Sequence, residues 1–299
     1  MPQRDGDLVK VEAPGEAHAA VMSARASGKT IGVVPTMGAL HEGHLSLIRR
    51  AREECGYVAV SIFVNPTQFG ESADLEGYPR TLVKDLKKCD AAGVDLVFVP
   101  DNDAMYAPDH TTWVEVGRLT QGLCGMSRPG HFRGVTTVVT KLFNILAPDR
   151  AYFGMKDYQQ LVVVQRMVRD LNMPIEIVPC PIVRESDGLA MSSRNRRLSA
   201  EERAAATALS EALGAFVEMV ADGEREVAPL IEAMSERIIS EPKAELDYVS
   251  IVDARSLEDA RRVEGQVVAA LAVWMGNTRL IDNAVVDVSS DRAANDAKE

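Results

Sequence analysis

The stretch VVPTMGALHEGH, from Val33 to His44, decides the fold of this 299-residue chain. The apolar run 31–34 predicts a buried strand, and Pro35 ends it. Two glycines, Gly38 and Gly43, then frame a turn that opens into apolar side chains at helical spacing. A strand, a glycine turn and a helix bring backbone N–H groups and a helix N-terminus up to a phosphate. The stretch therefore predicts an anion site on an α/β sheet.

Two histidines, His41 and His44, lie in this turn. They can donate hydrogen bonds to phosphate oxygens or, as imidazolium, offset the negative charge that builds up there. The alternative is structural, because glycine turns follow strands in many α/β proteins and nearby histidines can be surface residues. The motif by itself leaves these two interpretations equally supported, and the motifs that follow it favour the phosphate site.

Composition excludes several classes of protein. With 33 basic and 44 acidic side chains, the net charge of −11 argues against a nucleic-acid or membrane-surface binder. The four cysteines are widely spaced, which predicts reduced thiols rather than a disulfide framework or a zinc site. The longest apolar run, Val267 to Met275, is shorter than the roughly 20 residues of a membrane span, and no signal peptide is apparent. We expect a cytoplasmic protein.

The hydrophobic pattern predicts two domains. Buried strands and amphipathic helices alternate in the first, which favours a doubly wound parallel sheet, Rossmann-like in class, over residues 1–185. The strands are expected at 31–34, 57–66, 94–100, 149–154 and 175–180, and the helices at 45–55, 81–93, 135–146 and 156–172. A short strand is expected at 112–116, followed by an irregular stretch to residue 134.

Residues 186–299 are predicted to form a smaller α+β domain that begins with a mobile loop. A capping-box pattern from Ser199 to Glu202 starts a long alanine-rich helix, and a second helix is expected at 227–239. Three strands at hairpin-like spacing follow, with a turn at Gly276 and Asn277. The polar residues 289–299 are expected to be disordered.

Two neutral amides, Asn65 and Gln68, follow the predicted strand 57–66. Ligands of parallel sheets bind beyond the carboxyl ends of the strands, so an amide there can read a hydroxyl or a carboxylate. Asn65 before a proline is equally typical of a turn, whereas Gln68 is a poor turn former and favours a ligand contact.

Three basic or glycine-containing segments also suggest anion binding. The loop with Arg128, His131 and Arg133 precedes a helix, although a solvated basic loop is the alternative. Lys156 falls at a predicted helix start, where its charge opposes the helix dipole unless an anion binds; the alternative is an exposed surface lysine. Residues 191–198 hold two serines and three arginines, which can close over a triphosphate or form a charged hinge.

Six ordered motifs together resemble the pantothenate synthetase (pantoate–β-alanine ligase) family of the nucleotidylyl-transferase superfamily. They are PTMGALHEGH, FVNPTQF, YPRT, RPGHFRGV, FGMKDYQQ and MSSRNRRL, and they span about residues 31–200. The resemblance implies ATP-dependent condensation of (R)-pantoate with β-alanine through a pantoyl adenylate, which releases AMP and pyrophosphate. It implies no covalent enzyme intermediate, so positioning and charge stabilisation are the work of the protein.

The resemblance also implies roles for individual residues. The catalytic residues are His44, as proton donor, with His41, Lys156 and Arg194. Gln68 is implied to bind pantoate and β-alanine, and Gln160 to bind pantoate. The implied ATP-binding residues are Met37, Gly38, Ala39, Leu40, His41, Glu42, Gly43, His44, Gly154, Met155, Lys156, Asp157, Val183, Met191, Ser192, Ser193 and Arg194.

Magnesium is expected because ATP phosphates need their charge neutralised. Asp85 is the candidate carboxylate near the metal, but Lys84 stands where the family can carry a second aspartate, so no protein ligand is assigned. The family is typically a homodimer. The rival functions are another adenylyl or cytidylyl transferase of the superfamily and a nucleotide-binding protein without chemistry.

Overall fold

The computed structural model describes residues 6–70 and 75–289. Contacts divide this part of the chain into two compact units. The first unit comprises residues 6–70, 75–120, 125–155 and 160–183, and the second comprises 121–124, 156–159 and 184–289. Residues 290–299, most of the tail predicted to be disordered, lie outside the described residues.

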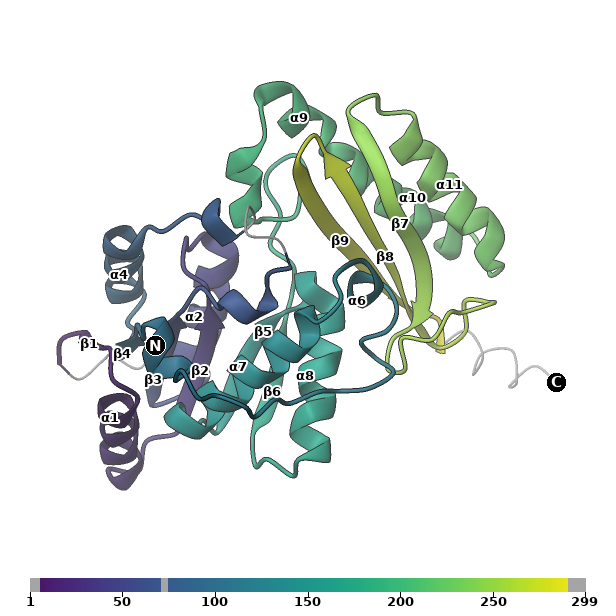
Figure 1. Ribbon diagram of the computed structural model, residues 1–299. Coiled ribbons are helices and arrows are strands. Elements are labelled where there is room, and N and C mark those ends of the chain that lie inside the picture. The colour runs from purple at the N-terminus through teal and green to yellow at the C-terminus, as the bar shows by residue number, and fades with distance from the viewer. Residues whose placement is uncertain (1–5, 71–74, 290–299) are drawn as a thin grey trace. The chain divides into compact units, whose positions relative to one another are not determined.

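The first unit is built on a six-stranded parallel sheet in the order β1-β4-β3-β2-β5-β6 (Figure 1). Its strands are β1 (Val9–Val11), β2 (Ile31–Thr36), β3 (Tyr57–Ile62), β4 (Leu96–Phe98), β5 (Arg150–Gly154) and β6 (Glu176–Cys180). The central strands are rich in β-branched residues that are buried on both faces, as parallel strands covered by helices must be. The predicted doubly wound parallel sheet is confirmed.

Helices cover both faces of this sheet. Helices α1 (Pro14–Ala26), α7 (His131–Leu146) and α8 (Tyr158–Asp170) pack on one face, in a core that includes Val33 and Phe98. Helices α2 (Glu42–Glu54) and α4 (Leu82–Ala91) pack on the other face, against Val34 and Val60. The single-turn helices α5 (Asn102–Met105) and α6 (Cys124–Ser127) and the 3-10 turns η1 (Pro66–Gln68) and η2 (Met155–Asp157) lie in the connections.

The strand predicted at residues 112–116 is wrong, because this stretch is irregular. The backbone N–H and carbonyl of Val114, at its centre, are bound by hydroxyls of α7 rather than by a neighbouring strand. The Val114 N–H donates to Thr137 Oγ1 at 3.0 Å, and Thr136 Oγ1 donates to the Val114 carbonyl at 2.6 Å. Alternating apolar residues therefore line a helix here and not a sheet.

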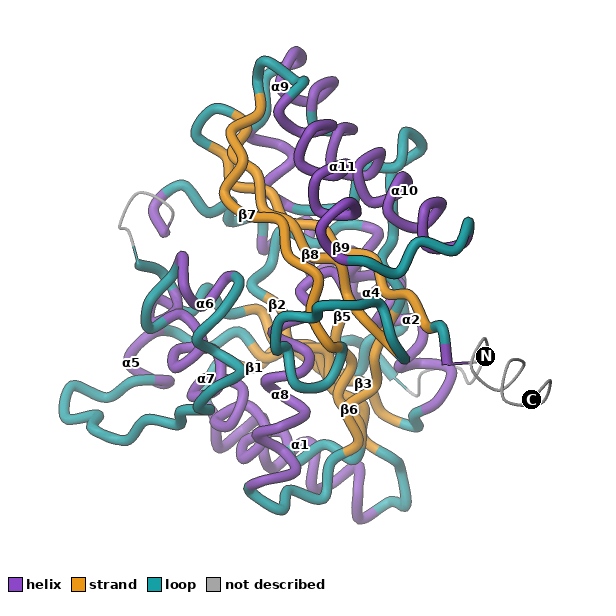
Figure 2. Tube along the Cα trace, turned by 90° about the vertical axis from the view of Figure 1, so that its right-hand side faces the viewer, coloured by secondary structure: helices purple, strands orange, loops and turns teal. Residues whose placement is uncertain are grey.

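The second unit contains a three-stranded antiparallel sheet in the order β7-β8-β9 (Figure 2). Its strands are β7 (Ala244–Asp253), β8 (Gln266–Met275) and β9 (Thr278–Asp287), and its helical segments are η3 (Ser193–Arg197), α9 (Ala200–Ala205), α10 (Thr207–Ala221) and α11 (Val227–Ile239). The predicted capping box is present, because the Ser199 N–H donates to Glu202 Oε2 at 2.8 Å and the Glu202 N–H donates to Ser199 Oγ at 3.2 Å.

The segment Ala200–Ala221 is long and apolar enough to cross a membrane by length and composition. Its apolar side chains, among them Leu209, Leu213 and Phe216, are instead buried in the core against the three-stranded sheet. A core helix passes the same length test, so this segment is weak evidence for a membrane span.

A buried ion pair joins α2 to the strand that follows α4. Arg52 Nη1 donates to Asp95 Oδ2 at 2.6 Å, and both side chains are about one-twentieth exposed. The same carboxylate oxygen accepts the Val58 N–H at 2.7 Å. The pair therefore connects helix α2, strand β3 and the start of β4.

We predict that Asp95→Asn lowers the free energy of unfolding by about 3–5 kcal/mol, because it leaves the Arg52 charge buried without its counter-ion. Urea denaturation measures the change. Asp170→Asn, in an exposed pair with Arg169, is the matched control and should stay within about 0.5 kcal/mol of the original chain. Equal stability of the two variants would contradict the prediction.

Candidate active site

The predicted ligand residues of the first unit lie where three neighbouring strands end. Strand β2 pairs with β3 on one side and with β5 on the other, so the chain changes its direction of progress across the sheet at β2. Ligands of doubly wound sheets bind outside the carboxyl ends of the strands at this point. Met37 follows β2, Asn65 follows β3, and Gly154 ends β5.

The loop after β2 is held by a buried carboxylate of helix α4. Asp85, which is 1% exposed, accepts the Ala39 N–H on Oδ2 and the Leu40 N–H on Oδ1, both at 2.9 Å. Thr81 Oγ1 donates to the same carboxylate at 3.0 Å, and the Lys88 ammonium donates to the Leu40 carbonyl. Asp85 and Lys88 of α4 thus bind the loop backbone, and Thr81, the N-cap residue of α4, binds the Asp85 carboxylate.

The loop needs this support because its backbone is strained. Gly38 has a φ of 81°, and Ala39 has a φ of 51° despite its Cβ. A non-glycine residue in this region costs on the order of 1–3 kcal/mol. A Cβ at Gly38 would lie 3.3 Å from Asp85 Oδ2, so glycine also lets the carboxylate approach.

Asp85 is on the same helical face as the buried Cys89. This shared face is the feature of the sequence that indicates a buried, hydrogen-bonded role for Asp85. A carboxylate on an apolar face must find partners, and here they are backbone N–H groups 45 and 46 residues away in sequence. The backbone amides of Gly38, Ala39 and Leu40 are all engaged within the protein, since the Gly38 N–H donates to Thr36 Oγ1 at 3.1 Å. The predicted ATP contacts of these residues stay predictions.

The two histidines begin helix α2 as a pair. His41 is the N-cap residue, and its backbone N–H donates to Nδ1 of His44 at 3.3 Å. The rings are 4.1 Å apart between centroids. An imidazole nitrogen that accepts a hydrogen bond carries no proton, so the neutral His44 ring has its proton on Nε2. His44 is thus set as a hydrogen-bond donor through Nε2.

The two amides after β3 form one hydrogen-bonded group. Asn65, 1% exposed, donates from Nδ2 to Gln68 Oε1 at 2.9 Å and to the Gly134 carbonyl at 3.2 Å. Gln68, 9% exposed, donates from Nε2 to the Met37 thioether at 3.3 Å. This contact brings the residue that follows β2 next to a glutamine that follows β3.

The basic residues at and just before the start of α7 contact protein groups. Arg128 Nη2 donates to the Gln68 carbonyl at 3.3 Å, and His131 Nδ1 donates to the same oxygen at 2.8 Å. The Arg133 guanidinium lies over the Trp113 ring, 4.9 Å from its centroid. Arg128 and His131 therefore hold the turn that carries Gln68.

Gln160, on the first turn of α8, is half-buried and makes no side-chain hydrogen bond within the described residues. Its amide can both donate to a ligand and accept from one. Gly154 has open space where a Cβ would stand, so the end of β5 is accessible. Val183 is half-buried at the end of the first unit.

The remaining predicted residues belong to the second unit. Lys156 lies in the 3-10 turn η2, with a side chain 19% exposed, and its carbonyl accepts the Asn283 side-chain N–H at 2.9 Å. Ser192 caps η3, since its Oγ accepts the Arg194 N–H at 3.2 Å. Met191 is half-buried, and Ser193 is buried.

Ion pairs anchor the segment that leads into this arginine-rich turn. Arg203 donates to Asp187 and to Glu185, each at 2.7 Å, and Asn195 Nδ2 donates to Glu185 Oε1 at 2.8 Å. The hydrogen bond from Arg203 lowers the pKa of the Asp187 carboxyl. Residues 185–187 are therefore tied to helix α9, and the predicted closing residues 191–194 follow them.

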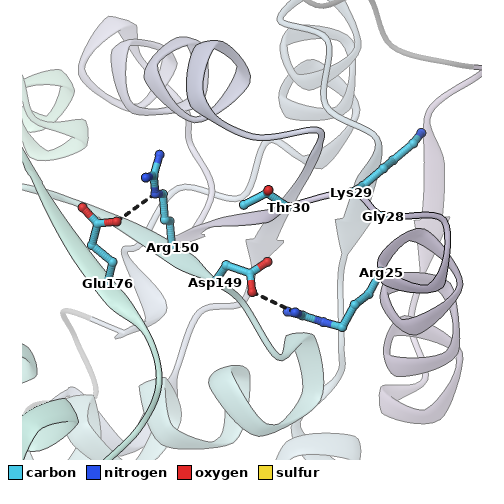
Figure 3. A pocket seen from close by; sticks show the side chains of 7 residues that line it. All are labelled: Arg25, Gly28, Lys29, Thr30, Asp149, Arg150 and Glu176. Atoms are coloured by element: carbon cyan, nitrogen blue, oxygen red, sulfur yellow. Dashed lines mark hydrogen bonds and ion pairs between the residues drawn. The ribbon is translucent and has the colours of Figure 1, made fainter.

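A polar hollow of about 500 Å³ lies at the amino ends of β2, β5 and β6, the opposite edge of the sheet from the predicted site (Figure 3). Both of its carboxylates are paired with arginines of the same lining. Arg25 donates to Asp149 at 2.8 Å, Asp149 accepts the Ile31 N–H at 2.7 Å, and Arg150 donates to Glu176 at 2.8 Å. The hollow contains none of the predicted site residues.

Comparison with known proteins identifies the family. The family model described as pantoate-beta-alanine ligase matches residues 10–285. A pantothenate synthetase of Heliobacterium modesticaldum is 58% identical over 261 residues, which are 87% of this chain and 93% of that protein. One of Moorella thermoacetica is 56% identical over 269 residues, 90% of this chain and 95% of that protein.

Solved structures agree. The crystal structure of pantothenate synthetase from Thermus thermophilus superposes with a TM-score of 0.88 at 45% identity, covering 92% of this chain and 98% of that one. Pantoate-beta-alanine ligase from Francisella tularensis, complexed with beta-gamma ATP and β-alanine, superposes with a TM-score of 0.76 at 32% identity, covering 93% of this chain and 97% of that one. The chain belongs to the pantoate–β-alanine ligase family.

We predict that Asp85→Ala accelerates hydrogen exchange of the Ala39 and Leu40 amides by about 10-fold or more, because each loses its acceptor. Hydrogen exchange followed by mass spectrometry on peptides covering residues 37–44 measures the change. Lys84→Ala, at the exposed neighbouring position of α4, is the control and should leave these peptides unaffected. Unchanged exchange in Asp85→Ala would contradict the assignment.

Proposed function

We propose that this chain condenses (R)-pantoate with β-alanine to pantothenate, using ATP and passing through a pantoyl adenylate. A pantoate carboxylate oxygen attacks the α-phosphorus of ATP, and pyrophosphate leaves. The β-alanine amine then attacks the activated carbonyl carbon, and AMP leaves with the oxygen that it gained. The observation that carries the proposal is the His41–His44 pair at the carboxyl edge of the sheet in a chain that matches the ligase family over residues 10–285.

The catalytic roles follow from charge. ATP accumulates negative charge on its phosphates as pyrophosphate leaves, and donors aimed at those oxygens lower the barrier. His44, with its proton on Nε2, is proposed as the donor to the leaving phosphates, with His41 beside it. Lys156 and Arg194 are proposed to supply the permanent positive charges for the phosphates.

The remaining proposed ATP contacts are the loop and helix start of the first unit, the end of β5 and η2, and the residues before η3. They are Met37 to His44, Gly154 to Asp157, Val183, and Met191 to Arg194. Asp157 is proposed to lie near the ribose, and Val183 to contact adenine through its backbone. These residues make up the nucleotide-binding part of a domain at 1–185 and of the loop that opens a smaller domain at 186–299.

Magnesium is proposed to arrive with ATP, held by phosphate oxygens and water. Among the described residues, no group of three or more His, Cys, Asp or Glu side chains that could hold a metal ion is found. Asp85, the weak candidate ligand, is 1% exposed, and its carboxylate already accepts three hydrogen bonds. No step of the mechanism is assigned to a protein-bound metal.

Gln68 and Gln160 are proposed to bind pantoate, with Gln68 also close to β-alanine. Their side chains are neutral, so they can orient an anion without neutralising the carboxylate that must attack. Buried amides left unpaired by an analogue that lacks a hydroxyl would disfavour it. The chain is further proposed to act as a homodimer in the cytoplasm, without nucleic-acid or membrane partners.

We predict that the purified chain forms AMP and pantothenate one for one, and only when pantoate, β-alanine and ATP are all present. His44→Ala should lower kcat by about 10²–10³-fold, because one donor aimed at the transferring phosphoryl group is lost. His18→Ala, on the exposed face of α1, is the matched control and should retain full activity.

Products are separated and quantified by chromatography, and circular dichroism checks that the variants are folded. Accumulation of a stable nucleotide conjugate that β-alanine does not consume would support a transferase instead. ATP binding without turnover of any substrate would indicate a nucleotide-binding protein without catalytic activity.

A further inference from the structure

Tyr106, which ends helix α5, has a hydroxyl that donates to Asn65 Oδ1 at 2.9 Å. Its ring is held on several sides. The His110 ring meets it edge-on at 5.1 Å, the Trp113 ring stacks at 6.5 Å, and the Lys141 ammonium lies 5.5 Å from its centroid. Burial raises the pKa of Tyr106, so its hydroxyl keeps its proton at neutral pH and can donate. The hydroxyl is therefore a fixed donor directly behind Asn65.

The orientation of the Asn65 amide follows from two backbone groups that have no choice of role. The Thr67 N–H can only donate, and it faces Oδ1 of Asn65 at 3.4 Å. The Gly134 carbonyl can only accept, and it faces Nδ2 at 3.2 Å. Tyr106 and the Thr67 hydroxyl add two donors to Oδ1, each at 2.9 Å. In a flipped amide, Nδ2 would face the Thr67 N–H, a donor against a donor, and Oδ1 would face the Gly134 carbonyl, an acceptor against an acceptor.

The orientation of Gln68 is then also determined. Because Nδ2 of Asn65 donates to it, the atom of Gln68 on that side is the carbonyl oxygen Oε1. The amide nitrogen of Gln68 points the other way, toward the thioether of Met37. A thioether is a weak acceptor, so a ligand oxygen displaces it at little cost. Gln68 therefore presents N–H donors, and not its carbonyl, to a ligand.

We propose that Tyr106 is a positioning residue which, through Asn65, holds Gln68 as a donor to an oxygen of pantoate. The inference rests on the proposed function and assigns the direction of one of its substrate contacts. Pantoate offers carboxylate and hydroxyl oxygens, which accept from such a donor. Gln68 offers no acceptor to the amine of β-alanine. Any contact between Gln68 and β-alanine is therefore made by the β-alanine carboxylate. The lone pair of the β-alanine nitrogen stays free to attack.

Tyr106 lies outside the shell of groups that touch pantoate in this account, so its effect is indirect. Without the Tyr106 hydroxyl, Oδ1 of Asn65 accepts hydrogen bonds only from Thr67. The side-chain amides of Asn65 and Gln68 are then held less firmly. The loss of one neutral hydrogen bond corresponds to roughly a 3- to 10-fold change in an equilibrium constant. The effect should appear in pantoate binding and not in ATP binding.

The first variant is Tyr106→Phe, which removes the hydroxyl and keeps the ring. Steady-state kinetics with the full chain should give a KM for pantoate raised about 3- to 10-fold, with the KM for ATP unchanged. Tyr57→Phe is the matched control, because the Tyr57 ring packs against the same core. Tyr57 is the first residue of β3, whereas Asn65 and Gln68 follow the last residue of that strand. It should match the original chain in both KM values.

The second variant is Gln68→Glu, which tests the direction of the contact. A carboxylate keeps the acceptor for Asn65 Nδ2 and replaces the ligand-facing donor by a negatively charged acceptor. If Gln68 donates to pantoate, kcat/KM for pantoate should fall about 10²-fold or more. If Gln68 uses its carbonyl, the carboxylate should replace it with little loss, and the proposal is overturned.

A KM for pantoate in Tyr106→Phe equal to that of the original chain would overturn the proposal, as would an equal rise in the KM for ATP. Failure of the proposed function is seen separately, as no pantothenate from the original chain. Titration calorimetry with pantoate then tests the positioning role of Tyr106 without turnover. A weaker Kd in Tyr106→Phe and an unchanged Kd in Tyr57→Phe would support it, and equal Kd values in all three proteins, or no pantoate binding by the original chain, would overturn it.

Discussion

The site of the first unit depends on one buried carboxylate, that of Asp85. The loop after β2 takes a left-handed backbone at two successive residues, Gly38 and Ala39, and this conformation costs free energy. Asp85 compensates by accepting two successive N–H groups of the loop, and Lys88 binds the carbonyl that follows. The loop sets where helix α2 begins, so the position of the histidine pair follows from this contact.

The same region avoids placing charge where an acidic substrate must react. The Asn65 and Gln68 amides contact each other after β3, the two histidines contact each other after β2, and the buried carboxylate of Asp85 has its oxygens turned to backbone donors. Arg128 and His131 act on Gln68 through its backbone carbonyl. An acidic protein of net charge −11 can therefore present a locally uncharged or basic surface to anions.

Much of the fold could be predicted because apolar periodicity is local. Buried β-branched runs predicted the parallel strands, and the capping box at Ser199 predicted the start of a helix. Residues 112–116 were mistaken for a strand because their partners are two threonines of α7, which lie more than 20 residues further along the chain. Helix α7 also begins earlier than predicted, at His131, after Gly130 in a left-handed conformation.

The site was predictable as a set of residue types but not as a network. Motif order indicated the histidines and glutamines. The Ala39 and Leu40 amides that bind Asp85, and the Gly134 carbonyl and Tyr106 hydroxyl that bind Asn65, come instead from distant elements. Tyr106 carried no signal in the sequence, because its role exists only through a hydroxyl that reaches Asn65 from 41 residues away. The helical face shared by Asp85 and Cys89 is the exception, since a carboxylate among apolar side chains signals buried partners.

The most direct test of the account follows one oxygen atom. Pantoate labelled with ¹⁸O in its carboxylate is converted in the presence of ATP and β-alanine, and AMP is analysed by mass spectrometry. Attack on the α-phosphorus transfers one labelled oxygen to AMP in each turnover, and the account predicts this result. Unlabelled AMP, or label in inorganic phosphate together with ADP, would contradict an adenylate intermediate.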